Sequence, residues 1–223
     1  MARGGVVRRR PVWVVACLVV IGAVVLVLVR LGGSADHGRA CPGGLDLSRQ
    51  TVQGSDLTQR PLRCINLERA TLEGAVSEAN LAGGNLHRVQ LPHGWLEHVD
   101  LSDADLSDAR AESAELDSVR LAHADLRRIK LDAATLSDVG LQGARLIGAS
   151  LRRTSLSRSD LAGADVSGAD LTGASLVDTN LRGARLDGAT LDRTIWSNVV
   201  CPDGTKSTGT QRESCDGHLH HAR

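Results

Sequence analysis

The sequence predicts an all-β protein: a right-handed, four-sided (quadrilateral) β-helix whose short coils stack into a solenoid, preceded by one N-terminal transmembrane helix. Three observations predict this architecture: a five-residue hydrophobic period, a near absence of aromatic side chains, and one long uncharged segment. The 223 residues include 3 Trp but no Phe and no Tyr, which excludes a conventional core anchored by large rings. The interior must therefore consist of small and aliphatic side chains.

A column of aliphatic residues recurs at every fifth position from Val76 to Trp196. Its members are leucine, apart from Val76, Ala111, Val166 and Trp196. Two residues before each member lies a second column, from Ala79 to Thr194, which holds mainly alanine and other small or β-branched residues. Neither column contains a charged residue. The same spacing begins at Leu47 but slips by one residue before Val76, which predicts an irregular opening coil.

A five-residue period fits neither an α-helix nor a flat strand. Five residues advance an α-helix by about 500°, so successive leucines would lie about 140° apart around it. In a straight strand side chains alternate between faces, so an odd spacing would place successive leucines on opposite faces. If the chain bends every five residues, each leucine and the small residue two positions earlier point toward a common axis. Four such sides close a coil, and residues 47–196 give about 7.5 coils with a length of ~36 Å.

The corners and the two ends of such a stack need special residues. The open ends are strand edges that are prone to pairing with other chains, so caps are needed. We expect the segment between Cys41 and Cys64 and the tail after Trp196 to supply them. At the corners, where unusual backbone angles are required, glycines cluster two residues after leucine: Gly143, Gly148, Gly163, Gly168, Gly173, Gly183 and Gly188.

The repeated motif A-(D/N)-L-x-x resembles that of the pentapeptide-repeat family. It appears, for example, as Ala104-Asp105-Leu106, Ala124-Asp125-Leu126 and Ala169-Asp170-Leu171. The resemblance covers roughly residues 45–197 and implies the quadrilateral solenoid derived above. Many family members place Phe in the central column, which is almost entirely leucine here. The closing stretch from Ile195 to Leu219 also resembles a tail of exported family members, in which the two cysteines are expected to be bridged. The resemblance thus implies a disulfide-closed C-terminal tail over residues 198–223.

An uncharged segment of eighteen residues, Val12–Val29, predicts a membrane-spanning helix. As a helix it would span about 27 Å, close to the ~30 Å hydrocarbon core of a bilayer. Arg8, Arg9 and Arg10 precede it, and positive residues stay on the cytoplasmic side. We therefore expect a cytoplasmic basic segment over residues 1–10, a signal-anchor helix in the lipid bilayer over 11–31, a linker over 32–44, and the rest of the chain outside the cytoplasm, at the cell membrane.

Two other interpretations of this segment remain open. Cleavage after Gly33-Ser34-Ala35 would give a secreted protein, because small residues occupy the positions that a signal peptidase needs. A lipoprotein signal at Cys17 fits less well, because the apolar stretch before Cys17 is short and the one after it is long.

The use of cysteine agrees with export. Cys41, Cys64, Cys201 and Cys215 lie outside the apolar segment, and an even number of cysteines in an exported chain predicts disulfides. Cys41 and Cys64 flank the start of the repeats, and Cys201 and Cys215 follow their end, which favours pairing within each set over the other two pairings. Free thiols or a zinc site built from all four are the alternatives, although no C-x-x-C spacing is present.

Charge is balanced overall, with 26 basic and 26 acidic residues, which argues against a free-standing nucleic-acid binder. A twenty-residue coil places charges of opposite sign over one another, and we expect salt-bridge ladders worth a fraction of a kcal/mol each. The pairs include Asp100 with Arg120 and Asp132 with Arg152. Glu97, however, would stack over Asp117. The alternative is therefore a polar docking surface formed by an acidic group: Glu97, Asp100, Asp103, Asp105, Asp108, Glu112, Glu115 and Asp117.

No pattern of catalytic residues is present. The sequence contains no HExxH, GxSxG, phosphate loop or dinucleotide-binding glycine motif, and nothing marks one Ser, His and Asp set as a triad. His218, His220 and His221 fit a short polar tail better than a metal site. We therefore expect no enzymatic activity, no catalytic or metal-binding residues and no cofactor.

These observations favour a non-enzymatic envelope protein, in which a rigid rod on a membrane anchor presents a binding surface to an extracytoplasmic protein. The alternative is analogy to family members that mimic DNA and inhibit or protect gyrase-type topoisomerases. Such mimics are strongly acidic, because they replace a duplex with its high charge density. This chain has only a mild excess of acidic residues after Gly32, and its predicted anchor and disulfides place it away from DNA.

Overall fold

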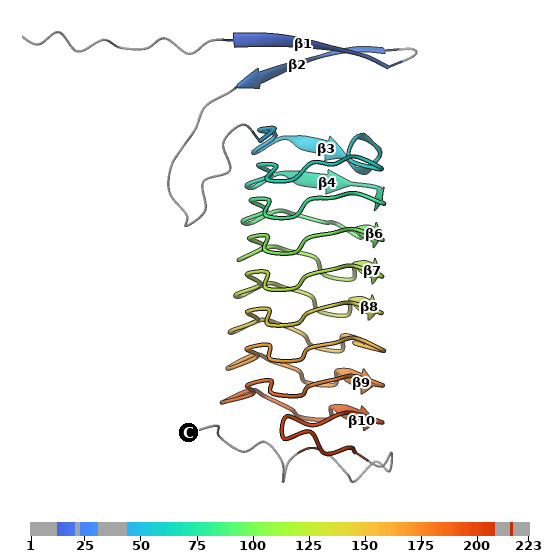
Figure 1. Ribbon diagram of the computed structural model, residues 1–223, viewed down its shortest axis with the longest axis vertical. Helices are drawn as coiled ribbons and strands as arrows, with labels where there is room; N and C mark the ends of the chain where they lie inside the picture. Colours follow the sequence, from blue (N-terminus) through green and yellow to red (C-terminus); the bar gives the residue numbers. More distant parts are fainter. Residues whose placement is uncertain (1–12, 21–22, 31–43, 208–214, 216–223) are drawn as a thin grey trace, which may run out of the picture.

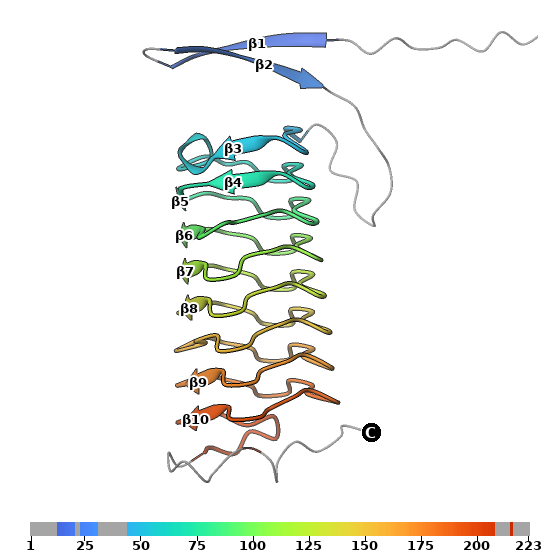
Figure 2. The same ribbon diagram turned by 180° about the vertical axis from the view of Figure 1, so that it is seen from behind.

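The computed structural model describes residues 13–20, 23–30, 44–207 and 215, with the backbone alone for the first two ranges. Between residues 44 and 207 the chain winds into a straight rod of stacked coils (Figure 1). The view from behind shows the same regular stacking on the opposite side (Figure 2). The rod is an all-β, right-handed solenoid, as the sequence predicts.

Parallel ladders of backbone hydrogen bonds hold the coils together on four sides. Partners in neighbouring coils are twenty residues apart over most of the rod, as in Asn80 with Asp100 and Asp105 with Asp125. One side forms a parallel sheet and continues through isolated pairs to the far end of the rod. Its strands are β5 (Ala75–Ser77), β6 (Trp95–Glu97), β7 (Glu115–Asp117), β8 (Thr135–Ser137), β9 (Ser175–Val177) and β10 (Ile195–Ser197). The period of twenty confirms that four five-residue sides make one coil.

The interior consists of the two columns that the period predicts. Leu121, Leu141 and Leu161 lie over one another and are at most 1% exposed. Where the small-residue column holds a hydroxyl, the hydroxyl donates to a carbonyl oxygen of the preceding coil, as Thr154 does to Leu131 at 2.7 Å. No buried polar side-chain atom in the described part of the chain lacks a hydrogen-bond partner. The interior is therefore a structural core, and a functional site must lie on the outer surface.

The predicted slip in register lies near the first coils. Three short elements occur here: β3 (Thr51–Gln53), the 3-10 turn η1 (Gly54–Asp56) and β4 (Thr71–Glu73). Leu72 and Val76 are four residues apart, and backbone partners across this short side are nineteen residues apart, as in Pro61 with Asn80. Gly54 packs so closely against β5 that a Cβ there would lie 2.2 Å from a backbone oxygen. The irregular opening coil is confirmed.

The corners of the coils require left-handed backbone. The residue two positions after a column residue has a positive φ along the rod, for example Gly163 (φ 66°) and Ala133 (φ 58°). All seven glycines predicted at corners have this conformation. Residues with a Cβ pay about 1–2 kcal/mol for it, which explains why glycine is favoured there without being required.

Exchanging glycine and alanine at two exposed corners should change stability in opposite directions. A Cβ at Gly163 would meet no atom within 4 Å, so Gly163→Ala changes only the backbone preference. We expect this substitution to lower the free energy of unfolding by about 1 kcal/mol, and Ala133→Gly to raise it by roughly 0.5 kcal/mol, because the relief of left-handed strain exceeds the entropy cost of glycine. Urea denaturation followed by circular dichroism measures both. Changes of the same sign would contradict this account of the corners.

The structure gives strands where the sequence analysis predicted a transmembrane helix over residues 11–31. β1 (Trp13–Val20) and β2 (Ala23–Arg30) pair in an antiparallel arrangement, with Trp13 opposite Arg30. The segment is rich in valine, which favours extended backbone, and an uncharged run has no polar face that separates a helical from a strand period. In the described part of the chain, no helix has the length and apolar character needed to cross a membrane.

A disulfide closes the C-terminal end of the rod. Cys201 and Cys215 are bonded, with their Cα atoms 5.6 Å apart, and both are buried. This confirms the predicted pairing of these two residues. Cys64 is also disulfide-bonded. Its predicted partner, Cys41, lies outside the described residues, so the Cys41–Cys64 pairing stays a prediction.

Candidate functional site

The Asp or Asn of the repeated motif closes a turn on the outer surface. The carboxylate of Asp165 accepts a hydrogen bond from the backbone N–H of Ser167 at 3.1 Å, and that of Asp105 does the same for Ser107 at 2.9 Å. Asparagine makes the equivalent bond at Asn66, Asn80, Asn85 and Asn180. These side chains satisfy a backbone donor just before the corner, which is a structural role. The sequence analysis missed this role, although the recurrence of Asp or Asn at this position in several repeats was the signal.

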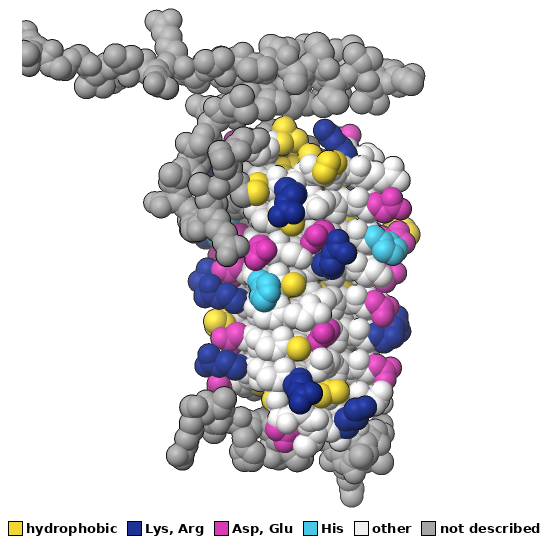
Figure 3. Space-filling view, in the orientation of Figure 1, with side chains coloured by type: hydrophobic (Ala, Val, Ile, Leu, Met, Phe, Trp, Pro, Cys, Tyr) yellow, Lys and Arg dark blue, Asp and Glu magenta, His cyan; other side chains and the backbone are white. Residues whose placement is uncertain are grey.

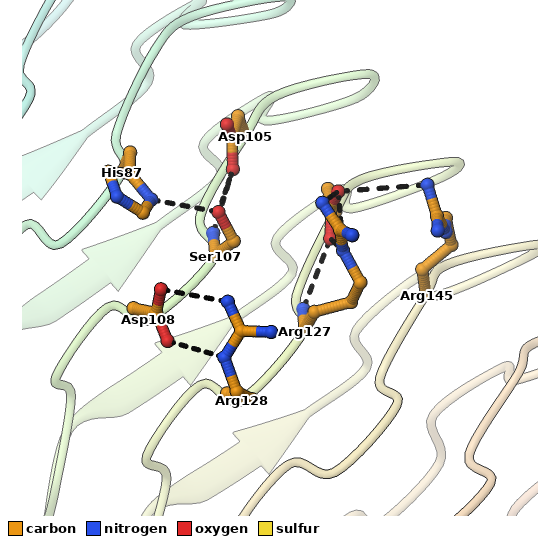
Figure 4. A network of polar contacts seen from close by, with 8 residues as sticks. His87, Asp105, Ser107, Asp108, Arg127, Arg128 and Arg145 are labelled. Atoms are coloured by element: carbon orange, nitrogen blue, oxygen red, sulfur yellow. Dashed lines mark hydrogen bonds and ion pairs between the residues drawn. The ribbon is translucent and has the colours of Figure 1, made fainter.

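Arginine side chains join neighbouring coils through carboxylates (Figure 4). Arg128 donates two hydrogen bonds to Asp108 one coil earlier, from Nε at 2.7 Å and from Nη2 at 3.0 Å. Beside this pair, Arg127 lies 2.7 Å from the carboxylate of Asp125, and Arg145 of the next coil lies 3.8 Å from the same carboxylate. The predicted charge ladders are therefore present.

One of the two ladder pairs named above forms and the other does not. Arg120 lies 3.2 Å from Asp100, as predicted. Arg152 instead lies 3.6 Å from Asp170, and its contact with Asp132 is a 3.1 Å hydrogen bond from the backbone N–H. The Asp132–Arg152 salt bridge was a wrong prediction, because the long arginine side chain reaches a different carboxylate. Over the visible face, charges of both signs are interspersed (Figure 3).

These contacts hold several carboxylates in the ionised form. The hydrogen bonds from Arg128 keep the pKa of Asp108 below its ordinary value of 3.8, and those from Arg158 do the same for Asp138. At Asp170 the hydroxyl and backbone N–H of Thr172 lower the pKa. A general acid or base needs a pKa near the working pH, so these lowered pKa values indicate structural carboxylates.

The rod should lose stability at acid pH. The pKa of these groups is lower in the folded chain than in the unfolded chain, so their contribution is complete above about pH 4 and is lost as the pH falls through the folded-state pKa. We expect a constant thermal unfolding midpoint between pH 7 and 5, and a fall below about pH 4. Asp170→Asn keeps an oxygen that can close the turn, as Asn180 does, and should make that fall shallower. Melting curves of both proteins between pH 2 and 7 test this; a midpoint that rises on acidification would contradict it.

The eight acidic residues of the predicted docking surface divide into two groups. Most of the first group have a close partner on the rod: Asp100 with Arg120 (3.2 Å), Asp108 with Arg128 (2.7 Å), Glu112 with Arg110 (3.1 Å) and Asp105 with Ser107. Asp103 lies at a left-handed corner. The second group, Glu97, Glu115 and Asp117, lies together on β6 and β7, where Glu97 is in register with Asp117 as predicted.

Trp95 lies beside this second group, and the sequence analysis missed it. Its side chain points away from the core and is 50% exposed. It is in register with Glu115 of β7. The signal was available: an aromatic residue directly before a column leucine, in a chain with 3 Trp and no other aromatic type.

The other surface features give weaker evidence of a functional site. A shallow hollow of about 380 Å³ is lined by Arg69, Arg88, Gln90, Asp108 and Arg110. Among the described residues, no group of three or more His, Cys, Asp or Glu side chains is arranged to hold a metal ion. The ring of His87 forms a 2.9 Å hydrogen bond with the Ser107 hydroxyl, and His218, His220 and His221 lie outside the described residues.

Residues 96–132, 114–153, 134–173 and 167–195 match the model of pentapeptide repeats, in eight copies. Residues 96–195 therefore belong to the pentapeptide-repeat family. Proteins of this family are generally non-enzymatic structural or interaction proteins. No curated protein sequence matches the chain significantly.

Several solved pentapeptide-repeat proteins are similar to the chain. HetL from Nostoc sp. strain PCC 7120, described as involved in heterocyst differentiation regulation, is 27% identical over 72% of this chain and 78% of its own, with a TM-score of 0.31. QnrB1, a plasmid-mediated fluoroquinolone resistance protein, is 18% identical over 64% of this chain and 80% of its own, with a TM-score of 0.40. Rfr23 from Cyanothece 51142 is 34% identical over 43% of this chain and 54% of its own, with a TM-score of 0.26.

Proposed function

We propose that this pentapeptide-repeat protein is a non-enzymatic scaffold, held at the outer side of a cell membrane, whose rod presents a binding surface to another protein. One observation carries the proposal: the rod has a fully packed interior and an outer surface on which several charges near mid-length are paired, whereas one acidic face that exposes a tryptophan has no Lys or Arg ion pair among the described residues. Charged side chains that are already paired on the rod attract other charged molecules less strongly than unpaired ones do. A rigid rod with one distinct face suits a docking protein.

The membrane anchor is part of this proposal. In lipid, the outer edges of a two-stranded hairpin such as β1–β2 would leave backbone N–H and C=O groups without partners, at a cost of several kcal/mol each, whereas a helix satisfies its own backbone. We propose that the segment over residues 11–31 becomes helical when it enters a bilayer, with residues 1–10 on the cytoplasmic side. Circular dichroism of the full chain with and without phospholipid vesicles tests this. Unchanged helical content on adding vesicles would contradict it.

The scaffold function is tested in cells with the full chain. A reporter enzyme that is active only outside the cytoplasm, fused after residue 223, should be active. Crosslinking through the rod should capture a protein partner, and capture should be lost when the repeats are deleted and the N-terminal segment is kept. An inactive reporter would contradict the location, and capture that persists without the repeats would contradict the scaffold.

The DNA-mimic alternative makes the opposite prediction. A mimic of duplex DNA would inhibit supercoiling by gyrase at low concentration. The interspersed charges of the rod do not reproduce the uniform negative charge of a duplex, so we expect no inhibition. A gyrase supercoiling assay with the full chain in detergent decides between the two functions, because inhibition would favour the mimic.

A further inference from the structure

The side of the rod formed by β5 to β8 carries an exposed tryptophan. Trp95 is 50% exposed, whereas Trp196, the other tryptophan whose side chain is described, is 8% exposed and belongs to the core. Ala75 and Glu115 occupy the equivalent positions in the coils before and after. Large amphipathic rings such as tryptophan are enriched where a protein surface binds a partner.

Three carboxylates lie on the same face as this ring, on β6 and β7. The register of β6 and β7 places Trp95 beside Glu115, and Glu97 beside Asp117, so the four residues form the corners of a rectangle on one face. We call these four residues the tryptophan face. Neighbouring strands are about 4.8 Å apart, and residues two apart on one strand about 6.7 Å, so all four side chains rise within reach of a single bound side chain.

The rod supplies little positive charge to the tryptophan face: Arg158 has an electrostatic interaction with Asp117, but its close ion pair is with Asp138, at 2.7 Å. The described residues show no Lys or Arg ion pair with any of these three carboxylates: Glu97 lies 3.8 Å from the His98 ring, and Asp117 accepts a hydrogen bond from the Ser118 hydroxyl at 3.2 Å. The stacking of Glu97 on Asp117 places like charges opposite each other, which is destabilising in a sheet. Asp100 and Asp108 on neighbouring sides, in contrast, each have an arginine partner. This face therefore favours a positive partner.

We propose that the tryptophan face binds a basic segment of a protein partner, with an arginine or lysine side chain lying over the Trp95 ring and between the carboxylates. The proposal rests on the scaffold function and identifies the class of partner. A guanidinium or ammonium group within about 6 Å of a tryptophan ring is attracted by the ring face. The carboxylates accept charge-assisted hydrogen bonds, and a planar guanidinium can donate two such bonds to one carboxylate as a bidentate pair. The carboxylates are not grouped closely enough to hold a metal ion, so an extended cation fits this face better.

Binding of a labelled peptide tests the proposal on the full chain in neutral phospholipid vesicles. The probe is a fluorescent tetra-arginine peptide, and binding is followed by anisotropy, with a tetra-glutamate peptide for comparison. We expect the arginine peptide alone to bind, with an affinity that falls as salt rises. Trp95→Thr, which introduces the residue found at the equivalent position in β8, and the double variant Glu97→Gln/Asp117→Asn should each weaken binding at least tenfold.

A matched control removes the same charge elsewhere. Asp187→Asn/Asp192→Asn deletes two exposed acids near the far end of the rod and should change the affinity less than twofold. Circular dichroism shows whether each variant is folded; Trp95 and the two acids lie outside the core, so all should be. Absence of binding to the unmodified protein, or equal weakening by the control and by Glu97→Gln/Asp117→Asn, would overturn the proposal.

Crosslinking in cells separates this proposal from the scaffold function. Loss of the captured partner with Trp95→Thr, and its retention with Asp187→Asn/Asp192→Asn, would support the tryptophan face. If both variants still capture the partner, the tryptophan face is not the binding site, while the scaffold function stands. If the unmodified protein captures nothing, the scaffold function fails, and the peptide measurement still decides whether the face binds cations.

Discussion

Leu141→Asp should abolish the cooperative folding of the middle of the rod. Leu141 is 1% exposed and lies between Leu121 and Leu161 in the leucine column. Truncating such a leucine to alanine costs about 2–5 kcal/mol, and a carboxylate in its place is buried without a partner, which costs more. Because each coil contacts only its neighbours, the damage should be centred on this coil and spread through the loss of its ladders. We expect a loss of at least about 4 kcal/mol in the free energy of unfolding, or no folded state.

Leu141→Met is the matched control for this substitution. It keeps the side chain apolar and nearly the same volume, and should cost less than about 1.5 kcal/mol. Urea denaturation of both variants, followed by circular dichroism, measures the difference. If Leu141→Asp unfolds at the same urea concentration as Leu141→Met, the side chain does not point into a packed interior. That result would contradict the leucine column as the core of the rod.

Removing the Cys201–Cys215 disulfide should open the C-terminal end of the rod and leave its centre intact. The two cysteines are fourteen residues apart, and closing a loop of this length stabilises by about 3 kcal/mol on the chain-entropy estimate. The bonded segment completes the stack: Val200 pairs with Asn180 of the previous coil and with Lys206 of the tail. Without the disulfide, the last strand edges lose the segment that holds their cap in place.

Hydrogen exchange of the double variant Cys201→Ala/Cys215→Ala measures this effect. We expect the backbone amides of Val199, Cys201 and Ser207, which are hydrogen-bonded in the cap, to exchange faster by up to about a hundredfold, which corresponds to ~3 kcal/mol. Amides around Leu141 should be unchanged and serve as the internal control, because stability in a repeat protein is transmitted between neighbours. Uniform acceleration along the rod, or none at Val199, would argue against a disulfide-held cap.

The five-residue period was sufficient to predict most of the architecture. A leucine at every fifth position with a small residue two places earlier leaves few folds that bury both columns, and the coil length of twenty follows from four sides. The same arithmetic correctly placed Glu97 over Asp117 and the seven corner glycines at left-handed backbone positions. Repeats make such inferences dependable, because each residue's neighbours are fixed by one number.

The N-terminal segment did not follow the prediction of a helix. The uncharged run has no alternation of polar and apolar residues, so its sequence does not separate a helix from a strand, and its surroundings decide. In the structure, Trp13–Val20 and Ala23–Arg30 pair as strands. The proposed helix in a bilayer would be the response of the same residues to a different solvent.

The sequence by itself determined the solenoid, its leucine column, its corners and the pairing of Cys201 with Cys215, because these depend on periodicity and on chain position alone. Only the tertiary structure decided which charges are paired and which are left without an ion pair. Long arginine side chains choose among several carboxylates within reach, as Arg152 does in lying near Asp170, and turn-closing aspartates satisfy backbone donors. The tryptophan face could be recognised only in the structure for the same reason. Whether a carboxylate has an arginine partner depends on how far side chains reach across coils and not on spacing along the chain.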